Sequence, residues 1–284
     1  MTNKQSISLG AVTLNVNDLR KQTEFYQEVI GLHIIEESHQ KVSLGIKDTN
    51  TILVKLEQLE PLKQRQQEAG LYHLAFLLST RSDLGGVLRH LIEIKAPIEG
   101  AANHGYSEAL YLHDVEGNGI EIYRDKDRSE WDITSSGRII GITEEMDVQG
   151  VLAARLTSLN KLPEGTVMGH VHLTGSDFLA NETFYRDVLG FDLTDDLGGH
   201  ARFFAKDGYH HQIGVNNWLG DTIRKRGEKS LGISQYEIIW YNVSDFVETK
   251  ARLVESGQTI EEKSDNEFKI KDSNGIIIHM ELKK

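Results

Sequence analysis

Two stretches of the chain share one pattern of hydrophobic and polar positions. Residues 10–32, GAVTLNVNDLRKQTEFYQEVIGL, align without a gap with residues 169–191, GHVHLTGSDFLANETFYRDVLGF. Each stretch begins with alternating apolar residues, which predict a strand, and continues with helical spacing through a Phe-Tyr pair. An aspartate at the junction, Asp18 or Asp177, is a predicted helix N-cap, and the glycine near the end fits a C-cap.

A second helical pattern follows each of these stretches. Residues 82–98 align without a gap with residues 244–260, and an apolar strand is predicted before each. A last strand follows each helix, after a D-x-x-G turn whose glycine suits a positive φ. The chain therefore contains four predicted units of one strand, one helix and about three strands, near residues 8–57, 70–124, 167–218 and 233–282.

This repeat predicts an α+β fold in which four βαβββ units pair into two domains with curved, mixed, barrel-like sheets. We expect units one and two to form an N-terminal domain over residues 1–125, without a complete metal site. Units three and four are expected to form a C-terminal domain over residues 167–284 that carries the active site. Residues 126–166 are the predicted linker, with a short helix near residues 145–157.

Composition limits the partners and the chemistry. The net charge of -12 argues against a nucleic-acid partner, and no apolar run is long enough to cross a membrane. The absence of cysteine excludes thiolate ligands and nucleophiles, so a transition-metal site would need His, carboxylate, amide or water ligands. We expect a cytoplasmic protein that binds a small molecule and can form a homo-oligomer.

The DxxxxxxFY…LG openings and the DxxGNxIE ending resemble the vicinal oxygen chelate superfamily, which includes glyoxalases, fosfomycin-resistance proteins and type I extradiol ring-cleaving dioxygenases. The stretches GLYHLAFLL, HGYSEALYLHDVEGNGIEIY, GHVHLTGSDF and YHHQIGVNNW are most similar to the catechol-2,3-dioxygenase-like branch. The resemblance covers almost the whole chain outside the linker. It implies a divalent metal, with Fe(II) favoured over Mn(II), Zn(II) and Ni(II), and a vicinal diol and dioxygen as substrates.

The resemblance also implies a ligand set of two histidines and one glutamate in the C-terminal domain. Those positions fall here on His170, Gln235 and His279. Glutamine is a weak neutral ligand, so Glu237 or Glu281, two residues further along the same strands, is an alternative source of the missing carboxylate. Alternatively, the site is differently composed and His211 joins the ligands.

Family resemblance further implies an acid/base role for the second histidine of the HH pair, His211, whose ordinary pKa lies near neutrality. Neighbouring side chains of a strand point to opposite faces, so His210 is expected to face away from the site. Tyr241 is the second candidate catalytic residue.

The N-terminal half keeps two of the family's ligand types, His73 and Glu121, but Ala11 replaces the third. We interpret this pair as the remnant of a second site. His104, Glu108 and Tyr111 are interpreted as a polar network beside that remnant, which organises the fold.

The sequence therefore predicts a metal-dependent, extradiol ring-cleaving dioxygenase that acts on a catechol or a similar diol. Two alternatives stay open: a non-catalytic binding protein on the same scaffold, favoured by the altered triad, and a glyoxalase-type lyase or isomerase, in which glutamine is a natural ligand. Fold resemblance alone does not separate them.

Overall fold

The computed structural model describes residues 5–220 and 223–283, and it contains all four predicted units. Units one and two each consist of a strand, a helical segment and three further strands. In unit one these are β1 (Ile7–Val16), α1 (Leu19–Phe25) with the π-helical turn η1 (Tyr26–Ile30), β2 (His33–Glu37), β3 (Lys41–Ile46) and β4 (Thr51–Gln58). In unit two they are β5 (Gly70–Leu78), α2 (Arg81–Glu93), β6 (Gly100–Asn103), β7 (Ser107–His113) and β8 (Gly119–Asp125).

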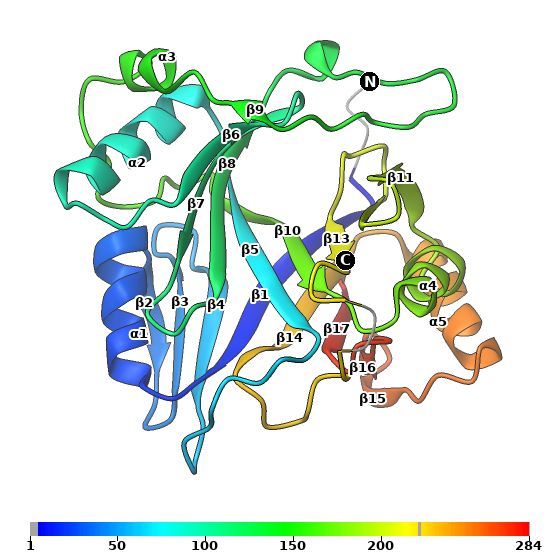
Figure 1. Ribbon diagram of the computed structural model, residues 1–284. Coiled ribbons are helices and arrows are strands. Elements are labelled where there is room, and N and C mark those ends of the chain that lie inside the picture. The colour runs from blue at the N-terminus through cyan, green and yellow to red at the C-terminus, as the bar shows by residue number, and fades with distance from the viewer. Residues whose placement is uncertain (1–4, 221–222, 284) are drawn as a thin grey trace.

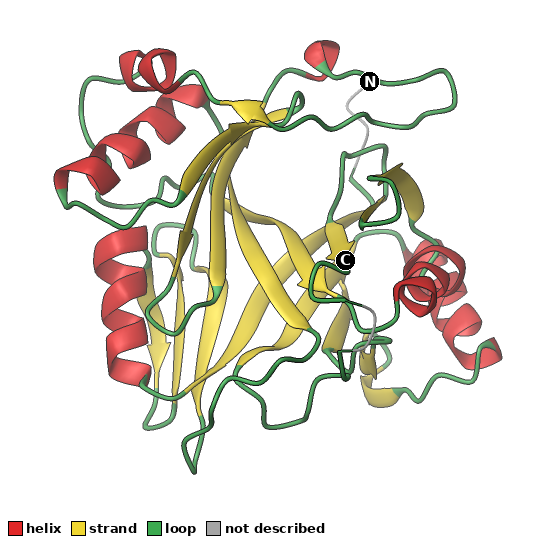
Figure 2. Ribbon diagram, in the orientation of Figure 1, coloured by secondary structure: helices red, strands yellow, loops and turns green. Residues whose placement is uncertain are grey.

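Units three and four repeat this order after the linker. Unit three contains β10 (Val167–Thr174), α4 (Phe178–Glu182) with the π-helical turn η3 (Thr183–Val188), β11 (Asp192–Asp196), β12 (Ala201–Ala205) and β13 (Ile213–Asn216). Unit four contains β14 (Gly232–Trp240), α5 (Val243–Glu255), β15 (Glu261–Ser264), β16 (Glu267–Lys271) and β17 (Ile277–Leu282). The predicted α+β class with curved, mixed sheets is confirmed, and the helices lie at the sides of the strands (Figure 2).

The strands form two sheets, each built from two units (Figure 1). One sheet has the order β15-β16-β17-β14-β1-β4-β3-β2 and combines units one and four; we call it sheet 1/4. The other has the order β11-β12-β13-β10-β5-β8-β7-β6-β9 and combines units two and three; we call it sheet 2/3. In each sheet the first strands of the two units pair antiparallel, β1 with β14 and β5 with β10.

This pairing differs from the predicted one, in which units one and two would share one domain and units three and four the other. The prediction assigned partners by closeness in sequence. All four units offer the same free edge on their first strand, however, so the repeat itself does not determine which two edges meet. The consequence for the site is large, because residues of units three and four do not share a sheet.

Units that are neighbours in sequence are instead joined by a contact between a helix and a turn. The hydroxyl of Tyr26, from the Phe-Tyr pair of unit one, donates to Asp114 of the D-x-x-G turn of unit two at 3.2 Å. The equivalent Tyr185 of unit three donates to Asp272 of unit four at 2.8 Å. The predicted N-caps are confirmed as well, since Asp18 accepts from the backbone N–H of Lys21.

The linker extends sheet 2/3. Its short strand β9 (Glu144–Glu145) pairs with β6, after the 3-10 turn η2 (Arg128–Glu130). The predicted linker helix is present but shorter, as α3 (Val148–Ala153), and it packs through the buried Val151. None of the helices in the described ranges is long and apolar enough to span a bilayer.

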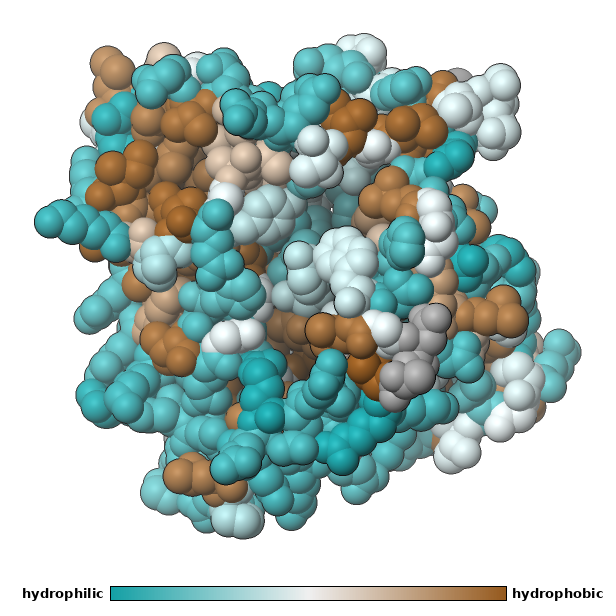
Figure 3. Space-filling model, viewed as in Figure 1, coloured by the Kyte–Doolittle hydropathy of each residue, from teal (hydrophilic) through white to brown (hydrophobic). Residues whose placement is uncertain are grey.

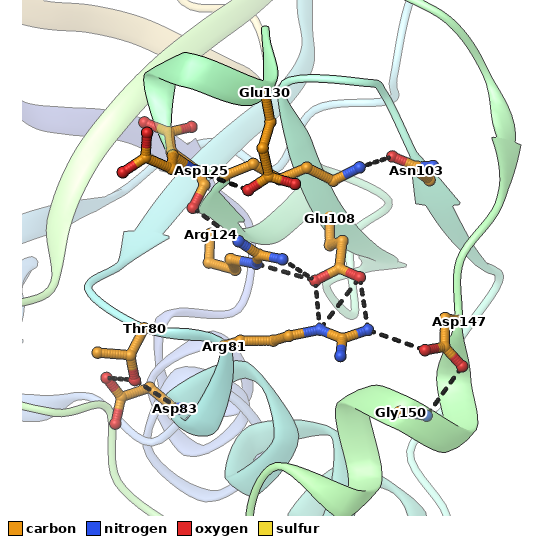
Figure 4. A network of polar contacts seen from close by, with 12 residues as sticks. Thr80, Arg81, Asp83, Asn103, Glu108, Arg124, Asp125, Glu130, Asp147 and Gly150 are labelled. Carbon is orange, nitrogen blue, oxygen red and sulfur yellow. Dashed lines mark hydrogen bonds and ion pairs between the residues drawn. The ribbon is translucent and has the colours of Figure 1, made fainter.

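Glu108 of β7 anchors α2 to sheet 2/3 (Figure 4). Its carboxylate accepts hydrogen bonds from Arg124 of β8 at 2.6 Å and from Arg81 of α2 at 2.9 Å. The carboxylate is buried, and burial of such a charge is stable only when it is paired. Glu108 therefore organises the fold, as predicted.

Candidate metal centre and substrate cavity

Three buried side chains converge on the inner face of sheet 2/3. They are His73 on β5, Glu121 on β8 and His170 on β10, the group in the described residues whose ligand atoms could hold a metal ion. The Nε2 atoms of the two histidines are 3.2 Å apart. The Glu121 Oε2 atom is 3.0 Å from Nε2 of His73 and 3.1 Å from Nε2 of His170. The strand order β10-β5-β8 produces this meeting, because the three residues lie on adjacent strands.

The electrostatics of the cluster match the protonation states that metal ligands need. Burial lowers the pKa of His170 to about 4, so its imidazole is neutral at neutral pH. Burial alone would raise the pKa of Glu121, but the adjacent His170 and His73 outweigh it and hold that pKa well below its usual range. A neutral imidazole and an ionised carboxylate both offer a lone pair to a cation.

The donor spacing fits a divalent metal with octahedral preferences. Ligands about 2.1 Å from such an ion, at right angles to each other, lie about 3 Å apart. The three separations in the cluster are 3.0, 3.1 and 3.2 Å. Two histidines and one carboxylate on one face of an octahedron form the facial triad typical of non-haem Fe(II) oxygenases, in which the remaining positions stay open. The residues present therefore fit the metal that the family resemblance implies.

A cavity of about 510 Å³ opens beside the triad and is lined by His73, Glu121 and residues of units two and three. The space-filling view is hollowed near its centre, in the region between β8 and β13 (Figure 3). His104 and Tyr111 form one part of the wall. The Nδ1 atom of His104 donates to the carbonyl of Ile142 at 2.8 Å, so its Nε2 atom accepts from the Tyr111 hydroxyl at 2.5 Å.

His211 lines another part of the same cavity, and its ring centroid is 4.3 Å from that of His170. The structure therefore places the predicted catalytic His211 beside the triad. Its neighbour His210 is not turned away, as predicted, because residues 210–212 form a bend and β13 begins only at Ile213. Strand alternation does not apply there, and both imidazoles are buried side by side.

Hydrogen bonds fix the orientation of His211. The carboxylate of Asp125 can only accept, so the Nε2 atom of His210 donates to it, at 2.9 Å. The Nδ1 atom of a neutral His210 then accepts from Nδ1 of His211, at 2.8 Å. This chain leaves Nε2 of His211 as the nitrogen with an available lone pair. His211 is thereby set up as a proton acceptor in the cavity.

The other two predicted ligands lie elsewhere. Gln235 and His279 belong to β14 and β17 of sheet 1/4, so the structure does not bring them together with His170. His279 donates to Glu267 at 2.8 Å and lies 3.8 Å from Glu237. The alternative carboxylate Glu237 is 2.6 Å from the ammonium of Lys55, and Glu281 is also on β17. The predicted ligand set of His170, Gln235 and His279 is therefore not assembled.

Sheet 1/4 carries a lysine at the position that corresponds to Gly214 of sheet 2/3, beside the triad rather than in it. The gapless repeat equates Thr13 with His172, and their strand partners are Lys55 and Gly214. In sheet 2/3 the glycine leaves room for the His172 ring, which comes within 3.0 Å of where a Cβ would be. In sheet 1/4 the lysine side chain fills this position and its ammonium reaches Glu237.

Tyr241, the second predicted catalytic residue, lies at the end of β14 rather than at the cavity. Its side chain is 46% exposed, and its hydroxyl lies 2.9 Å from the hydroxyl of Ser8. It is not among the residues that line the 510 Å³ cavity.

Two candidate ligands that the sequence assigned only to a remnant site are His73 and Glu121. Both were visible as family ligand types, but the third ligand was sought in unit one, where Ala11 stands. The structure supplies it from unit three, as His170. A sequence signal for this site was available. The first strands of units two and three each carry a histidine, His73 and His170, and these two strands pair directly.

Paired βαβββ units that surround a two-histidine, one-carboxylate cluster define a vicinal oxygen chelate fold. Residues 8–131 and 167–278 match the model of the Glyoxalase/Bleomycin resistance protein/Dioxygenase superfamily. The chain belongs to this superfamily, as the sequence resemblance indicated.

Individual relatives agree with this assignment. The chain is 34% identical to a catechol-2,3-dioxygenase of Bacillus subtilis (strain 168) over 270 residues, which cover 93% of each protein. It is 27% identical over 119 residues to biphenyl-2,3-diol 1,2-dioxygenase 2 of Rhodococcus globerulus, covering 40% of this chain and 60% of the relative. Among solved structures, glyoxalase I from Zea mays matches with a TM-score of 0.58 and 14% identity, covering 98% of this chain and 92% of the other. That last likeness concerns the fold alone.

Proposed function

We propose that this protein is a metal-dependent extradiol dioxygenase that cleaves the ring of a catechol, with its metal held by His73, Glu121 and His170. The observation that carries the proposal is the facial arrangement of these three donors beside an open cavity. The 34% identity to a catechol-2,3-dioxygenase over nearly the whole chain supports the reaction class. The cluster of two histidines and one carboxylate in sheet 2/3 supports this proposal over a non-catalytic binding protein, which the altered set of His170, Gln235 and His279 had favoured.

Extradiol cleavage breaks the ring bond beside one hydroxyl-bearing carbon, and both atoms of dioxygen enter the product. The diol supplies the electrons, so no external reductant is needed. His73, Glu121 and His170 would hold Fe(II), which when bound would supply the electron transfer between the diol and dioxygen.

Side chains of the protein carry out the proton transfers. Nε2 of His211 accepts a proton from a diol hydroxyl and later returns it, with Asp125 and His210 holding the ring in the required orientation. Tyr111, on another part of the cavity wall, is the strand partner of Glu121. Its hydroxyl orients the bound diol.

The experiment is to purify the protein without oxygen, load it with Fe(II), and add catechol with dioxygen. We expect one dioxygen consumed for each catechol, together with a visibly coloured ring-fission product. The variant His211→Ala should bind Fe(II) normally and lower kcat by about 100-fold or more. Fe(II) binding without oxygen uptake, or cleavage between the two hydroxyls to a colourless diacid, would contradict the proposal.

A further inference from the structure

The cavity is larger than a bare catechol requires. Its volume of about 510 Å³ lies within the range of roughly 300–1,000 Å³ that proteins use for drug-sized ligands. A single dihydroxylated ring held at the triad would leave much of this space without protein contacts. The residues that line the remaining space therefore indicate which substituent the ring of the substrate carries.

Aromatic and aliphatic side chains make up one side of this space. The Trp218 ring lies 4.7 Å from the Tyr72 ring and 5.7 Å from the His172 ring, measured between centroids. The Phe203 ring lies 4.7 Å from that of His211, and Leu197 adds an aliphatic contact near the mouth. This side offers an apolar surface directly next to the proposed catalytic histidine.

The facing wall is formed by small and aliphatic residues. Ala101 and Ala102 of β6 line the cavity together with Ile142 of the linker. Of the two alanines, Ala102 directs its side chain to the cavity face, because it pairs with Ala109, whereas Ala101 pairs with Leu110 of the core. Its small size leaves space that a larger residue would occupy. Apolar walls on both sides bind an apolar substituent by removing its surface from water.

The charges of the residues that line the cavity also favour an uncharged substituent. None of the described residues that line the cavity is a lysine or arginine, whereas Glu121 and Asp195 are acidic. Arg138 is the cation nearest to Asp195, at 2.6 Å, and is already paired with that buried carboxylate. A carboxylate on the substrate would lose its hydration without gaining a lysine or arginine partner, and it would meet a second carboxylate.

Resting on the proposed function, we propose that the substrate is an uncharged catechol with an apolar ring substituent, and that the cavity excludes catechols that carry a carboxylate. The substituent lies between Trp218 and Phe203 on one side and Ala102 of β6 on the other. Selectivity thus comes from the walls of the cavity rather than from the triad.

The test compares two catechols of similar size with the Fe(II)-loaded protein. One carries a methyl group para to one hydroxyl, and the other, protocatechuate, carries a carboxylate at that position. We expect kcat/KM for the methylcatechol to exceed that for protocatechuate by about 100-fold, because the carboxylate is buried without a partner. Similar values for the two compounds would overturn the proposal. If neither they nor catechol consume dioxygen, the proposed function fails instead.

A substitution that adds a positive charge at the cavity mouth gives a second test of the proposal. Leu197 is 43% exposed at the cavity mouth, so Leu197→Arg adds a charge there at little cost to the fold. We expect it to raise kcat/KM for protocatechuate relative to the methylcatechol by about 10-fold. The matched control is Leu156→Arg, because Leu156 is 83% exposed and does not line the cavity. An equal change in both variants would count against a selective cavity, and circular dichroism checks that both fold.

Discussion

The imidazoles of His210 and His211 face each other, with their Nδ1 atoms 2.8 Å apart. Neighbouring residues reach this arrangement because the chain bends immediately before β13. The Asp125 carboxylate, 2.9 Å from Nε2 of His210, defines the direction of the chain of hydrogen bonds. Proton acceptance by His211 thus depends on a carboxylate in another unit.

Replacing Asp125 tests this dependence. In Asp125→Asn, the amide can donate to His210, which allows the opposite tautomer and disturbs the orientation of His211. We expect kcat to fall by about 10–100-fold, the usual effect of removing an orienting partner, with unchanged Fe(II) content. The control is Asp127→Asn, which removes the same charge at an exposed position. Equal activity of the two variants would show that Asp125 does not act through His211.

Tyr111 and Glu108 come from the same strand, β7, but we expect opposite phenotypes from them. Tyr111→Phe removes the hydroxyl that donates to His104 in the cavity. Because the ring still packs, the free energy of unfolding should change little, whereas kcat should fall by about 100-fold. Steady-state oxygen uptake and urea denaturation measure the two quantities, and normal activity would remove Tyr111 from the mechanism.

Glu108→Gln should affect stability and spare the site. The substitution removes the charge that pairs with Arg81 and Arg124, so these two guanidinium groups lose a buried partner. We expect a loss of about 1–3 kcal/mol in the free energy of unfolding, measured in urea. Activity per folded molecule should stay close to that of the parent. A large loss of activity without a loss of stability would contradict the structural role.

The ion-paired cluster in sheet 1/4 predicts a pH dependence of stability. The nearby carboxylate of Glu237, 3.8 Å away, raises the pKa of His279, and Glu267, which is hydrogen-bonded to this histidine, adds to this effect. Burial alone would raise the pKa of Glu237, but His279 and Lys55 outweigh it and lower the pKa to about 2, so this carboxylate is ionised throughout. A histidine whose pKa is raised in the folded state contributes its full stabilisation of the fold at pH values below the pKa that it has in the unfolded chain. This contribution is lost as the pH rises through the raised pKa of the folded state.

His279→Gln should therefore cost more free energy of unfolding at about pH 5.5 than at about pH 9, as measured by urea denaturation. The control is His113→Gln, because His113 pairs with Glu99 at an exposed site where screening makes such pairs weak. A loss for His279→Gln that is the same at both pH values would show that its charge is not engaged by Glu237.

The fold could be predicted from the sequence because each unit carries its own signals. Asp18 and Asp177 cap their helices, and the D-x-x-G turns hold Asp114 and Asp272, as expected from the repeats. The pairing of units could not be predicted in this way. Four equivalent first strands can pair in more than one way, and only tertiary packing selects β5 with β10.

Only part of the candidate site could be predicted from the sequence, for the same reason. His170 and His211 were identified, because their motifs lie within a single unit. Gln235 and His279 lie in sheet 1/4, away from the cluster, and His73 and Glu121 belong to it, because the first strand of unit three pairs with that of unit two and not with that of unit four. Tyr241 lies away from the cavity and is 46% exposed.

The most direct test of the account is the metal content of ligand variants. The parent protein and the variants His73→Ala, Glu121→Gln and His279→Ala are purified without oxygen, loaded with Fe(II), desalted and assayed for iron. We predict about one iron per chain for the parent and for His279→Ala, and strong loss in His73→Ala and Glu121→Gln, because two remaining ligands seldom hold a metal. Iron retained by His73→Ala and Glu121→Gln but lost from His279→Ala would contradict the assignment of the site to sheet 2/3.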